Sequence, residues 1–427
     1  MARVLVVGAG LAGARICQEL RRTGFTGWIG LLGAEREAPY DRPPLTKEPH
    51  AEVDLRVAMG LDVWALADVV RLGCTAHALT EDGGSLRVRF SSASDLGAPG
   101  STGAEEELVA DAVVVATGAL PIVPSGWRQP GVHVLHTRPD ADRLWSSVHP
   151  GAWLGVVGGG WIGCEAAATA AARGARVTLF EAADRLLADR LPEQVGARVR
   201  QWLVEAGVAV HLGTPVEDVR SGDGGLDLRA GGTVHPVDEV LVGLGVRPAT
   251  GWLDGSGIAR DATGAVLADP WGRTNRPGVF AVGDAAARWS ARSGRHLPGG
   301  HWNEALTGPE VVAPVLAEWT LRSPDQRLPE AWSAPPTEAI PDPVPYVFSH
   351  VGERILQVMG DVAPGGEVLI RPDGPAWTAW VLDEQARLRG VCALGRPRDV
   401  AAARRAIRSD PAGRPPAADL LAKAQAG

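Results

Sequence analysis

The sequence has few of the residues that would support metal or dithiol chemistry. Its four cysteines stand far apart, with no C-x-x-C or C-x-x-x-x-C pair: Cys17, Cys74, Cys164 and Cys392. This arrangement excludes a disulfide relay between neighbouring cysteines and lacks the ligand spacing of zinc and iron–sulfur sites. We therefore predict no bound metal and no electron transfer through a protein dithiol.

A basic excess and a long apolar run are also missing. The formal net charge is −8 at pH 7, which argues against a nucleic-acid partner and against a basic membrane-binding surface. No apolar run approaches the roughly 18 residues of a transmembrane helix. The apolar N-terminus belongs to a glycine motif rather than to a signal peptide, because cleavage there would destroy that motif. We predict a cytoplasmic protein without a membrane partner, and we expect a monomer or a homodimer.

Two glycine-rich motifs are present, each after an apolar run typical of a strand. GAGLAG and GGGWIG place their glycines at Gly8, Gly10 and Gly13, and at Gly158, Gly160 and Gly163. The first glycine of each motif permits a tight turn, the second lets the backbone approach a pyrophosphate, and the third lets helix and strand pack closely. Two motifs predict two dinucleotides bound at once, and hydride transfer between a nicotinamide and a flavin needs both.

An acidic residue follows the next strand-like run after each motif. Glu35 follows residues 28–32, and Glu181 follows residues 176–180. Each carboxylate is expected to accept hydrogen bonds from an adenosine ribose. A carboxylate favours a free 2′-hydroxyl and repels a 2′-phosphate, so Glu181 predicts NADH over NADPH. Arg185 lies close by in the sequence and would favour a 2′-phosphate instead.

The stretch PYDRPPLTK, residues 39–47, resembles the flavin-contacting segment of the NADH-dependent ferredoxin reductases, which include putidaredoxin, rubredoxin and dioxygenase-component reductases. Further matches run along nearly the whole chain: ATG at 116–118, GGGWIGCE at 158–165, GLGVRP at 243–248, GVFAVGDAA at 278–286, HWNEAL at 301–306, VPYVFS at 344–349, GRPRDVAAARRAI at 395–407 and LLAKA at 420–424. PYDRPPLTK is far more specific than either glycine motif.

The resemblance implies a catalytic pair. Lys47 would place its ammonium near flavin N5 and pair with Glu165. A flavin gains negative charge on reduction, which an ammonium near N5 would stabilise, while the carboxylate offsets that ammonium in the oxidised state.

The resemblance also implies further cofactor contacts. Arg42 and Pro43 would lie along the flavin and its pyrophosphate, and Asp284 would bond the ribityl or phosphate side. Trp302 would begin a helix whose N-terminus faces the flavin pyrimidine carbonyl. The remaining expected contacts are glycine-rich turns at Ala116, Thr117, Gly118 and Gly245.

The length of 427 residues predicts more than one core. We expect an α/β protein with two Rossmann-like dinucleotide-binding domains and a C-terminal α+β domain. The predicted order is an FAD-binding domain in two parts, 1–107 and 237–326, an inserted NAD(H)-binding domain at 108–236, and a C-terminal reductase domain at 327–427.

Taken together, these features predict an FAD-dependent NADH oxidoreductase. Its electrons would pass to a small ferredoxin-type iron–sulfur protein that supplies a monooxygenase or dioxygenase. A basic face on the predicted helix 399–408 would suit an acidic ferredoxin, and its arginines are Arg398, Arg404, Arg405 and Arg408.

Two departures from the family pattern keep other functions open. No arginine follows ATG, and the family's Phe-Trp-Ser-Asp-Gln-Tyr-Gly is shortened to residues 347–352. One alternative is a self-contained FAD enzyme that oxidises NADH with oxygen or acts on a small organic substrate. Fifteen tryptophans could line an aromatic substrate pocket or pack the core. A redox-sensing NADH–FAD complex is a third possibility.

Overall fold

The computed structural model describes residues 1–47, 51, 53–92, 105–323, 326–327, 332, 342, 344–410 and 414–417. The chain forms two compact units. The first unit is Met1–Asp41, Glu52–Leu120 and Arg247–Asp342; the second unit is Arg42–Ala51, Pro121–Val246 and Pro343–Gly427. The run matched at 420–424 lies outside the described residues.

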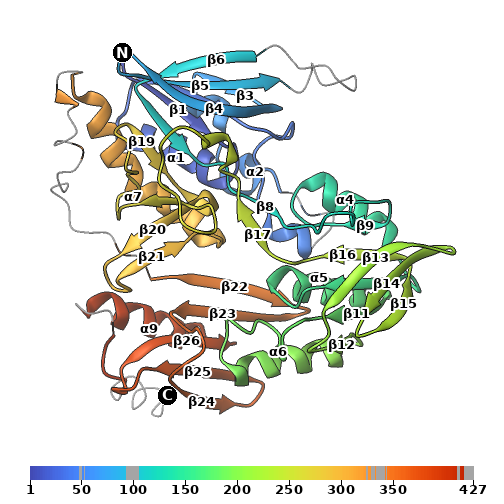
Figure 1. The fold of residues 1–427 in the computed structure, drawn as a ribbon. Helices are drawn as coiled ribbons and strands as arrows, with labels where there is room; N and C mark the ends of the chain where they lie inside the picture. Colours follow the sequence, from blue (N-terminus) through green and yellow to red (C-terminus); the bar gives the residue numbers. More distant parts are fainter. Residues whose placement is uncertain are drawn as a thin grey trace. The chain divides into compact units, whose positions relative to one another are not determined.

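A five-stranded parallel sheet is the centre of the first unit (Figure 1). Its order is β19-β7-β1-β2-β3, with β1 (Arg3–Val7), β2 (Trp28–Leu32), β3 (Val69–Arg71), β7 (Ala112–Val115) and β19 (Val279–Ala281). Alternate residues of β1 face opposite layers, as the period of a strand requires. Val4 and Val6 pack in a core with Ile16 of helix α1 (Leu11–Arg22), whereas Leu5 packs on the other face.

Helices cover one face of this sheet and an antiparallel sheet covers the other. The helical core joins α1 (Leu11–Arg22) to α7 (Trp302–Leu321). The opposite core contains side chains of the antiparallel sheet β4 (Cys74–Asp82), β5 (Ser85–Ser92) and β6 (Glu105–Ala110). The unit also contains α2 (Leu55–Met59), α3 (Val63–Leu66), η3 (Gly251–Leu253), η4 (Gly283–Ala285), β18 (Val266–Ala268), β20 (Ala286–Ser290) and β21 (Arg295–Pro298).

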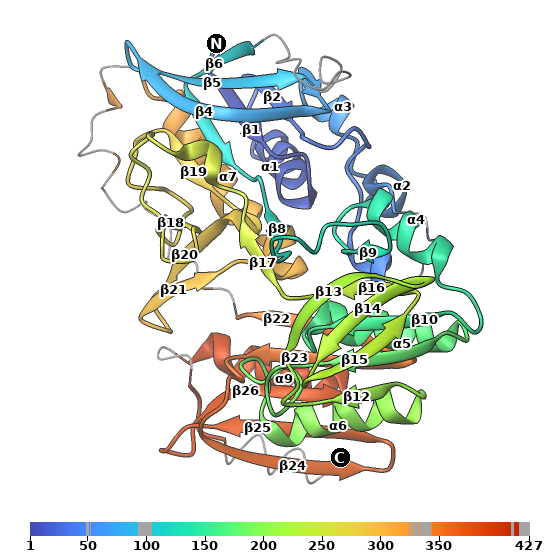
Figure 2. The same cartoon turned by 45° about the vertical axis from the view of Figure 1, so that its right-hand side comes forward.

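The second unit contains another five-stranded parallel sheet (Figure 2). Its order is β12-β11-β10-β16-β9, with β9 (Val132–His133), β10 (Trp153–Val157), β11 (Arg176–Phe180), β12 (Ala209–His211) and β16 (Glu239–Val242). Its helices are η1 (Pro43–Thr46), α4 (Arg138–Ser147), α5 (Trp161–Ala172) and α6 (Glu193–Glu205). The antiparallel strands β13 (Val216–Gly222), β14 (Gly225–Ala230) and β15 (Thr233–Val237) share a core with the parallel sheet.

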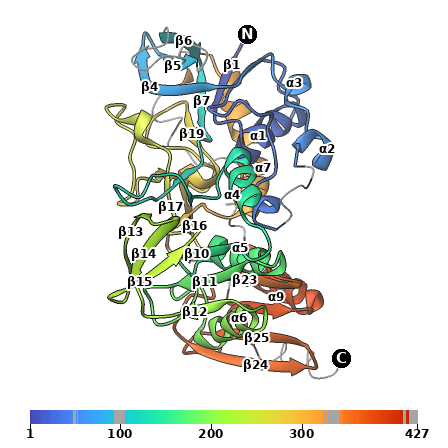
Figure 3. The ribbon, with the colours of Figure 1, turned by 90° about the vertical axis from the view of Figure 1, so that its right-hand side faces the viewer.

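An antiparallel C-terminal module completes the second unit (Figure 3). Its order is β22-β23-β26-β25-β24, with β22 (Tyr346–Val351), β23 (Arg354–Gly360), β24 (Glu367–Asp373), β25 (Ala376–Leu382) and β26 (Leu388–Leu394). Helix α9 (Pro397–Ser409) buries Val400, Ala403 and Ile407 in the core of this module. The predicted combination of two dinucleotide-binding folds and an α+β module is therefore confirmed.

Two of the points at which the chain passes between the units lie within short strands, β8 (Ala119–Pro121) and β17 (Val246–Pro248). The predicted boundaries at 107/108 and 236/237 fall before these crossings. The reason is that β7 pairs with β1 in the first parallel sheet, and β16 pairs with β10 in the second. The assignment of each segment to a cofactor stays a prediction.

Candidate functional site

Both glycine motifs form the same turn between a strand and a helix. Gly8 has φ +117° and Gly158 has φ +103°, in the left-handed region that favours glycine. A Cβ on Gly13 would lie 1.9 Å from the carbonyl oxygen of Gly8, and one on Gly163 would lie 2.0 Å from that of Gly158. These positions therefore require glycine for the close approach of helix and strand.

The second glycine of each motif lies in a different environment. A Cβ on Gly10 or Gly160 would meet no described atom within 4 Å. Each is the N-cap of its helix, α1 or α5, and contributes no side chain to the first N–H groups. Open space before a helix N-terminus suits a pyrophosphate.

Glu181 lies at the carboxyl end of β11, next to the second motif. Its Oε2 accepts a hydrogen bond from the Gly159 N–H at 2.6 Å, and its Oε1 accepts one from the Ala183 N–H at 2.8 Å. The nearby Arg185 donates instead to the carbonyl of Ala188 at 2.8 Å. The structure thus places the carboxylate at the motif and gives this arginine a backbone partner.

In the first unit, Glu35 lies after β2 and accepts a hydrogen bond from the Tyr40 hydroxyl at 2.5 Å. Thr117 of the ATG turn has a buried hydroxyl with no hydrogen-bond partner among the described residues. An orphaned buried hydroxyl is uncommon and is expected to be satisfied by a bound group. This unsatisfied hydroxyl and the space at Gly10 are compatible with a dinucleotide at the first motif.

Two further predicted contacts of the first unit lie in η4 and at the start of α7. Asp284 of η4 accepts a hydrogen bond from the Gly300 N–H at 2.9 Å. Trp302 begins α7, and its Nε1 donates to Asp41 Oδ1 at 2.6 Å. The hydrogen bond between Trp302 and Asp41 ties α7 to the PYDRPPLTK segment.

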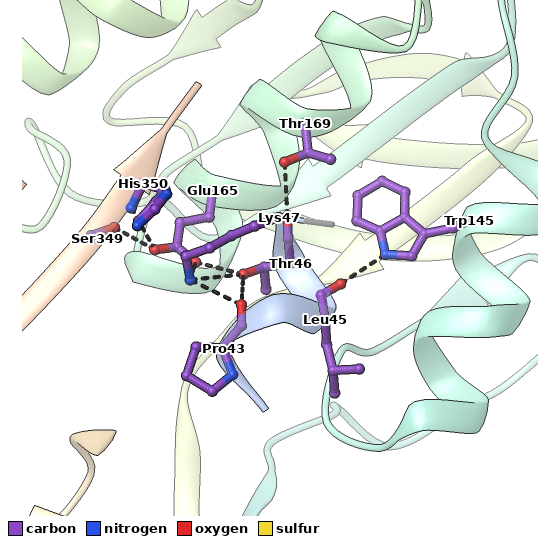
Figure 4. Close-up of polar contacts among 9 residues, drawn as sticks. All are labelled: Pro43, Leu45, Thr46, Lys47, Trp145, Glu165, Thr169, Ser349 and His350. Carbon is purple, nitrogen blue, oxygen red and sulfur yellow. Dashed lines mark hydrogen bonds and ion pairs between the residues drawn. The ribbon is translucent and has the colours of Figure 1, made fainter. Parts of the chain in front are cut away.

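The second unit brings Lys47 and Glu165 together (Figure 4). The ammonium lies 2.8 Å from Glu165 Oε2, and the two side chains are only 13% and 8% exposed. Lys47 also donates to the carbonyl of Pro43 at 3.0 Å. Thr46 adds a hydroxyl donor 2.5 Å from the same carboxylate oxygen. A buried ammonium and carboxylate are thus paired and hydrogen-bonded, as their desolvation requires.

The short helix η1 is held in place by the rest of the second unit. Trp145 Nε1 donates to the carbonyl of Leu45 at 2.8 Å, and the Thr169 hydroxyl donates to that of Thr46 at 2.8 Å. Arg42, just before η1, donates to the carbonyl of His136. These contacts from α4, α5 and the loop before α4 fix the backbone that carries Lys47.

Three donors to Glu165 were missed by the sequence analysis: the Thr46 hydroxyl described above and two groups from a distant strand. The Ser349 hydroxyl donates to Glu165 Oε1 at 2.7 Å, and the His350 N–H donates to the same oxygen at 2.9 Å. Both belong to β22, in the segment that departs from the family pattern. Only its departure from that pattern singled this segment out, because the contact spans more than 180 residues.

The four cysteines are buried and unpaired. Burial raises the pKa of Cys17 to about 12 and raises the pKa values of Cys164 and Cys392 strongly. Within the described ranges, no cluster of three or more His, Cys, Asp or Glu side chains is arranged to hold a metal. No helix in that part of the chain is long and apolar enough to cross a membrane.

Two fingerprint turns and a buried ammonium–carboxylate pair are the features expected of an α/β oxidoreductase that binds dinucleotides. The chain belongs to the pyridine nucleotide-disulphide oxidoreductase family, whose model matches residues 2–306, and the model of the reductase C-terminal domain matches residues 346–426. The predicted family membership and enzyme class are therefore confirmed.

Known proteins resemble the chain over nearly its full length. The ferredoxin–NAD(+) reductase component of the p-cumate 2,3-dioxygenase system of Pseudomonas putida is 33% identical, covering 96% of this chain and 94% of that protein. The ferredoxin reductase component of chlorobenzene dioxygenase from Cupriavidus sp. is 33% identical, covering 95% of this chain and 92% of that protein. The putidaredoxin reductase–putidaredoxin complex matches with a TM-score of 0.80 and 26% identity, covering 95% of this chain and 92% of that chain.

Proposed function

We propose that this protein is an FAD-dependent NADH reductase whose electrons go to a small ferredoxin-type iron–sulfur protein. When bound, FAD supplies a hydride acceptor for NADH and releases electrons one at a time. The buried Lys47–Glu165 pair carries the proposal, because it provides a fixed ammonium in the segment that contacts flavin in the family. Relatives that serve dioxygenase systems support the choice of partner.

The two fingerprints have separate roles in this proposal. The α1 turn at Gly10 and the ribose acceptor Glu35 would hold FAD, with the hydroxyl of Thr117 satisfied by it. The α5 turn at Gly160 and the acceptor Glu181 would hold NADH. Holding both cofactors in fixed positions removes the entropy cost of their encounter.

A lysine suits the position of residue 47 better than an arginine does. The chain has 42 lysines and arginines, of which only Lys47 and Lys423 are lysines. The ammonium of Lys47 donates to Glu165 and Pro43 and lies 3.5 Å from the Thr46 hydroxyl. A compact ammonium donates in three directions from one atom, whereas a guanidinium presents a planar fork.

The docking surface that we propose for the iron–sulfur protein is the basic face of α9. The arginines on this face are exposed: Arg398, Arg404, Arg405 and Arg408. Because the opposite face of α9 packs on its own module, the four guanidinium groups point to solvent. An acidic partner would be steered to them by charge. The rate at which this partner takes electrons from the reduced enzyme should therefore fall as the salt concentration rises.

Stopped-flow mixing tests the proposed function. The holoprotein is mixed with one equivalent of NADH, the flavin's visible band is followed, and air or a ferredoxin is then added. We expect rapid bleaching, slow recovery in air and fast recovery with ferredoxin. Fast recovery in air without a response to ferredoxin would instead identify a self-contained oxidase.

Lys47→Ala tests the role of the ammonium. Loss of a charged hydrogen-bond donor should slow flavin reduction by about ten- to a hundredfold and leave NADH affinity nearly unchanged. Lys47→Arg keeps the charge but not the geometry, so it should restore little of the rate. A variant that loses NADH binding and keeps the reduction rate would place Lys47 away from N5.

A further inference from the structure

Glu165 divides its hydrogen bonds between two parts of the second unit (Figure 4). Its Oε2 accepts hydrogen bonds from Lys47 and Thr46, the last two residues of the PYDRPPLTK segment. Its Oε1 accepts from the Ser349 hydroxyl and the His350 N–H, both on β22 of the C-terminal module. One oxygen therefore faces the ammonium, and the other is bound by β22.

We propose that Ser349 is a positioning residue for the Lys47–Glu165 pair and that, through this pair, the C-terminal module sets the charge beside the flavin. This inference rests on the proposed function, because it uses the position of Lys47 near N5. Ser349 touches neither cofactor in this proposal. It acts by holding the carboxylate.

The place of Ser349 in the sheet supports a fixed geometry. β22 is an edge strand that pairs with β23 alone in the described sheet, with Ser349 opposite Leu356 and His350 opposite Ile355. Ser349 is 1% exposed, so bulk water does not compete with its hydroxyl for the Glu165 carboxylate. The carboxylate of Glu165 thus meets a donor held by a strand rather than by a mobile loop.

The electrostatic consequence follows from burial. A buried carboxylate that accepts several hydrogen bonds has part of its negative charge neutralised and keeps one orientation. Removing the Ser349 hydroxyl leaves Oε1 with the hydrogen bond from the His350 N–H. More of the carboxylate's negative charge then remains beside the ammonium. This extra negative charge disfavours the negative charge that the flavin gains on reduction. The midpoint potential of bound FAD should therefore fall.

A purely structural role for Ser349 predicts something different. In that case its loss would lower the stability of the fold without moving the potential. The chain offers a matched control in Thr378, which is also 1% exposed and lies in the same sheet. Its hydroxyl donates to a different carboxylate, Asp399, at 2.7 Å. Thr378→Val removes a buried hydroxyl–carboxylate bond that does not involve Glu165.

The experiment compares Ser349→Ala, Ser349→Thr and Thr378→Val holoproteins. The measurements are the midpoint potential of bound FAD, the single-turnover rate of flavin reduction by NADH, the Kd for NADH and the thermal unfolding midpoint. For Ser349→Ala we expect a lower potential and reduction slowed about five- to twentyfold, with NADH affinity within about twofold of wild type. Ser349→Thr should restore the potential and rate, and Thr378→Val should lower only stability.

Wild-type potential and rate in Ser349→Ala would overturn the inference, as would an equal change in Thr378→Val. Should Ser349→Ala not fold, Ser349→Cys keeps the volume with a weaker donor, and an unchanged potential there overturns the inference equally. Lys47→Ala distinguishes a failure of the proposed function from a failure of the role proposed for Ser349. If it leaves flavin reduction unaltered, the proposed role of Lys47 fails; if it slows reduction while Ser349→Ala does not, only the role of Ser349 fails.

Discussion

Glu181 has two backbone donors in the structure, and this makes it a part of the turn as well as a candidate ribose acceptor. The Gly159 N–H belongs to the second glycine motif, so the carboxylate and the motif are held in one geometry. A sequence pattern predicted the residue type at this position. The hydrogen bonds explain why an acidic side chain there is oriented before any ligand binds.

Glu181→Ala should therefore erode the preference for NADH over NADPH by about tenfold, because a ribose hydroxyl loses its charged acceptor. Glu181→Arg should erode it further by attracting a 2′-phosphate. The ratio of kcat/KM for the two nucleotides measures the effect. Asp189→Ala removes a carboxylate that lies later in the same segment and is 87% exposed, and it serves as the control. Unchanged selectivity in the Glu181 variants would refute the assigned role.

The buried thiols should be unreactive in the native protein. Burial raises the pKa of Cys17 from 9.0 to about 12, so the reactive thiolate is nearly absent at pH 8. Titration with a thiol-specific disulfide reagent should find no fast-reacting group in the folded protein and four in denaturant. The unfolded chain releases this proton at lower pH than the folded one, so stability should fall as pH rises from about 9 toward 12. A fast native thiol would contradict this assignment.

The strand–turn–helix element is the part of the protein that the sequence described best. In both fingerprints the sequence predicted a tight turn at the first glycine and close helix–strand packing at the third, and the structure has both. These features could be predicted because a Cβ clash within a few residues is a local property. The strands at 28–32 and 176–180 and the helix at 399–408 also agree with β2, β11 and α9. Local spacing and periodicity suffice for such elements.

The two packing glycines provide a test of these elements. Gly13→Ala should destabilise the first unit and release FAD, since the new methyl group would overlap the carbonyl of Gly8; overpacking of this kind costs typically about 1–3 kcal/mol or more. Gly163→Ala should weaken NADH binding and leave the flavin bound. Flavin absorbance after desalting and NADH titration measure the two effects. Gly251→Ala meets no described atom within 4 Å and should behave as wild type.

The C-terminal module and the second parallel sheet belong to one compact unit, and aromatic contacts join them. Trp377 of β25 and Trp202 of α6 have ring centroids 6.2 Å apart, and Arg198 lies 5.0 Å from the Trp377 ring. Arg354 of β23 forms an ion pair with Glu205 of α6 at 2.7 Å. These contacts lie in the same compact unit as β22 and α5, the helix that carries Glu165.

Trp377→Ala should lower the free energy of unfolding by about 3–5 kcal/mol, as expected for a buried aromatic side chain. Trp377 is 3% exposed. Trp153 of β10 is 43% exposed, so Trp153→Ala in the same unit should cost much less. Urea unfolding followed by tryptophan fluorescence and circular dichroism gives both values. Equal losses of unfolding free energy in the two variants would show that the contacts of Trp377 with α6 contribute little.

The sequence by itself determined the class of the protein, its two fingerprint turns, and Lys47, Glu165 and Glu181 as the residues of interest. The fingerprint turns and Glu181 follow from short-range patterns whose cause is local sterics and hydrogen bonding, whereas the resemblance to the ferredoxin reductases singled out Lys47 and Glu165. Only the tertiary structure decided which donors surround Glu165, because Thr46, Ser349 and the His350 N–H approach it from distant segments. It also decided that residues 42–47 join the second unit rather than the first. Such contacts depend on which buried surfaces meet, and a spacing pattern along the chain does not encode that.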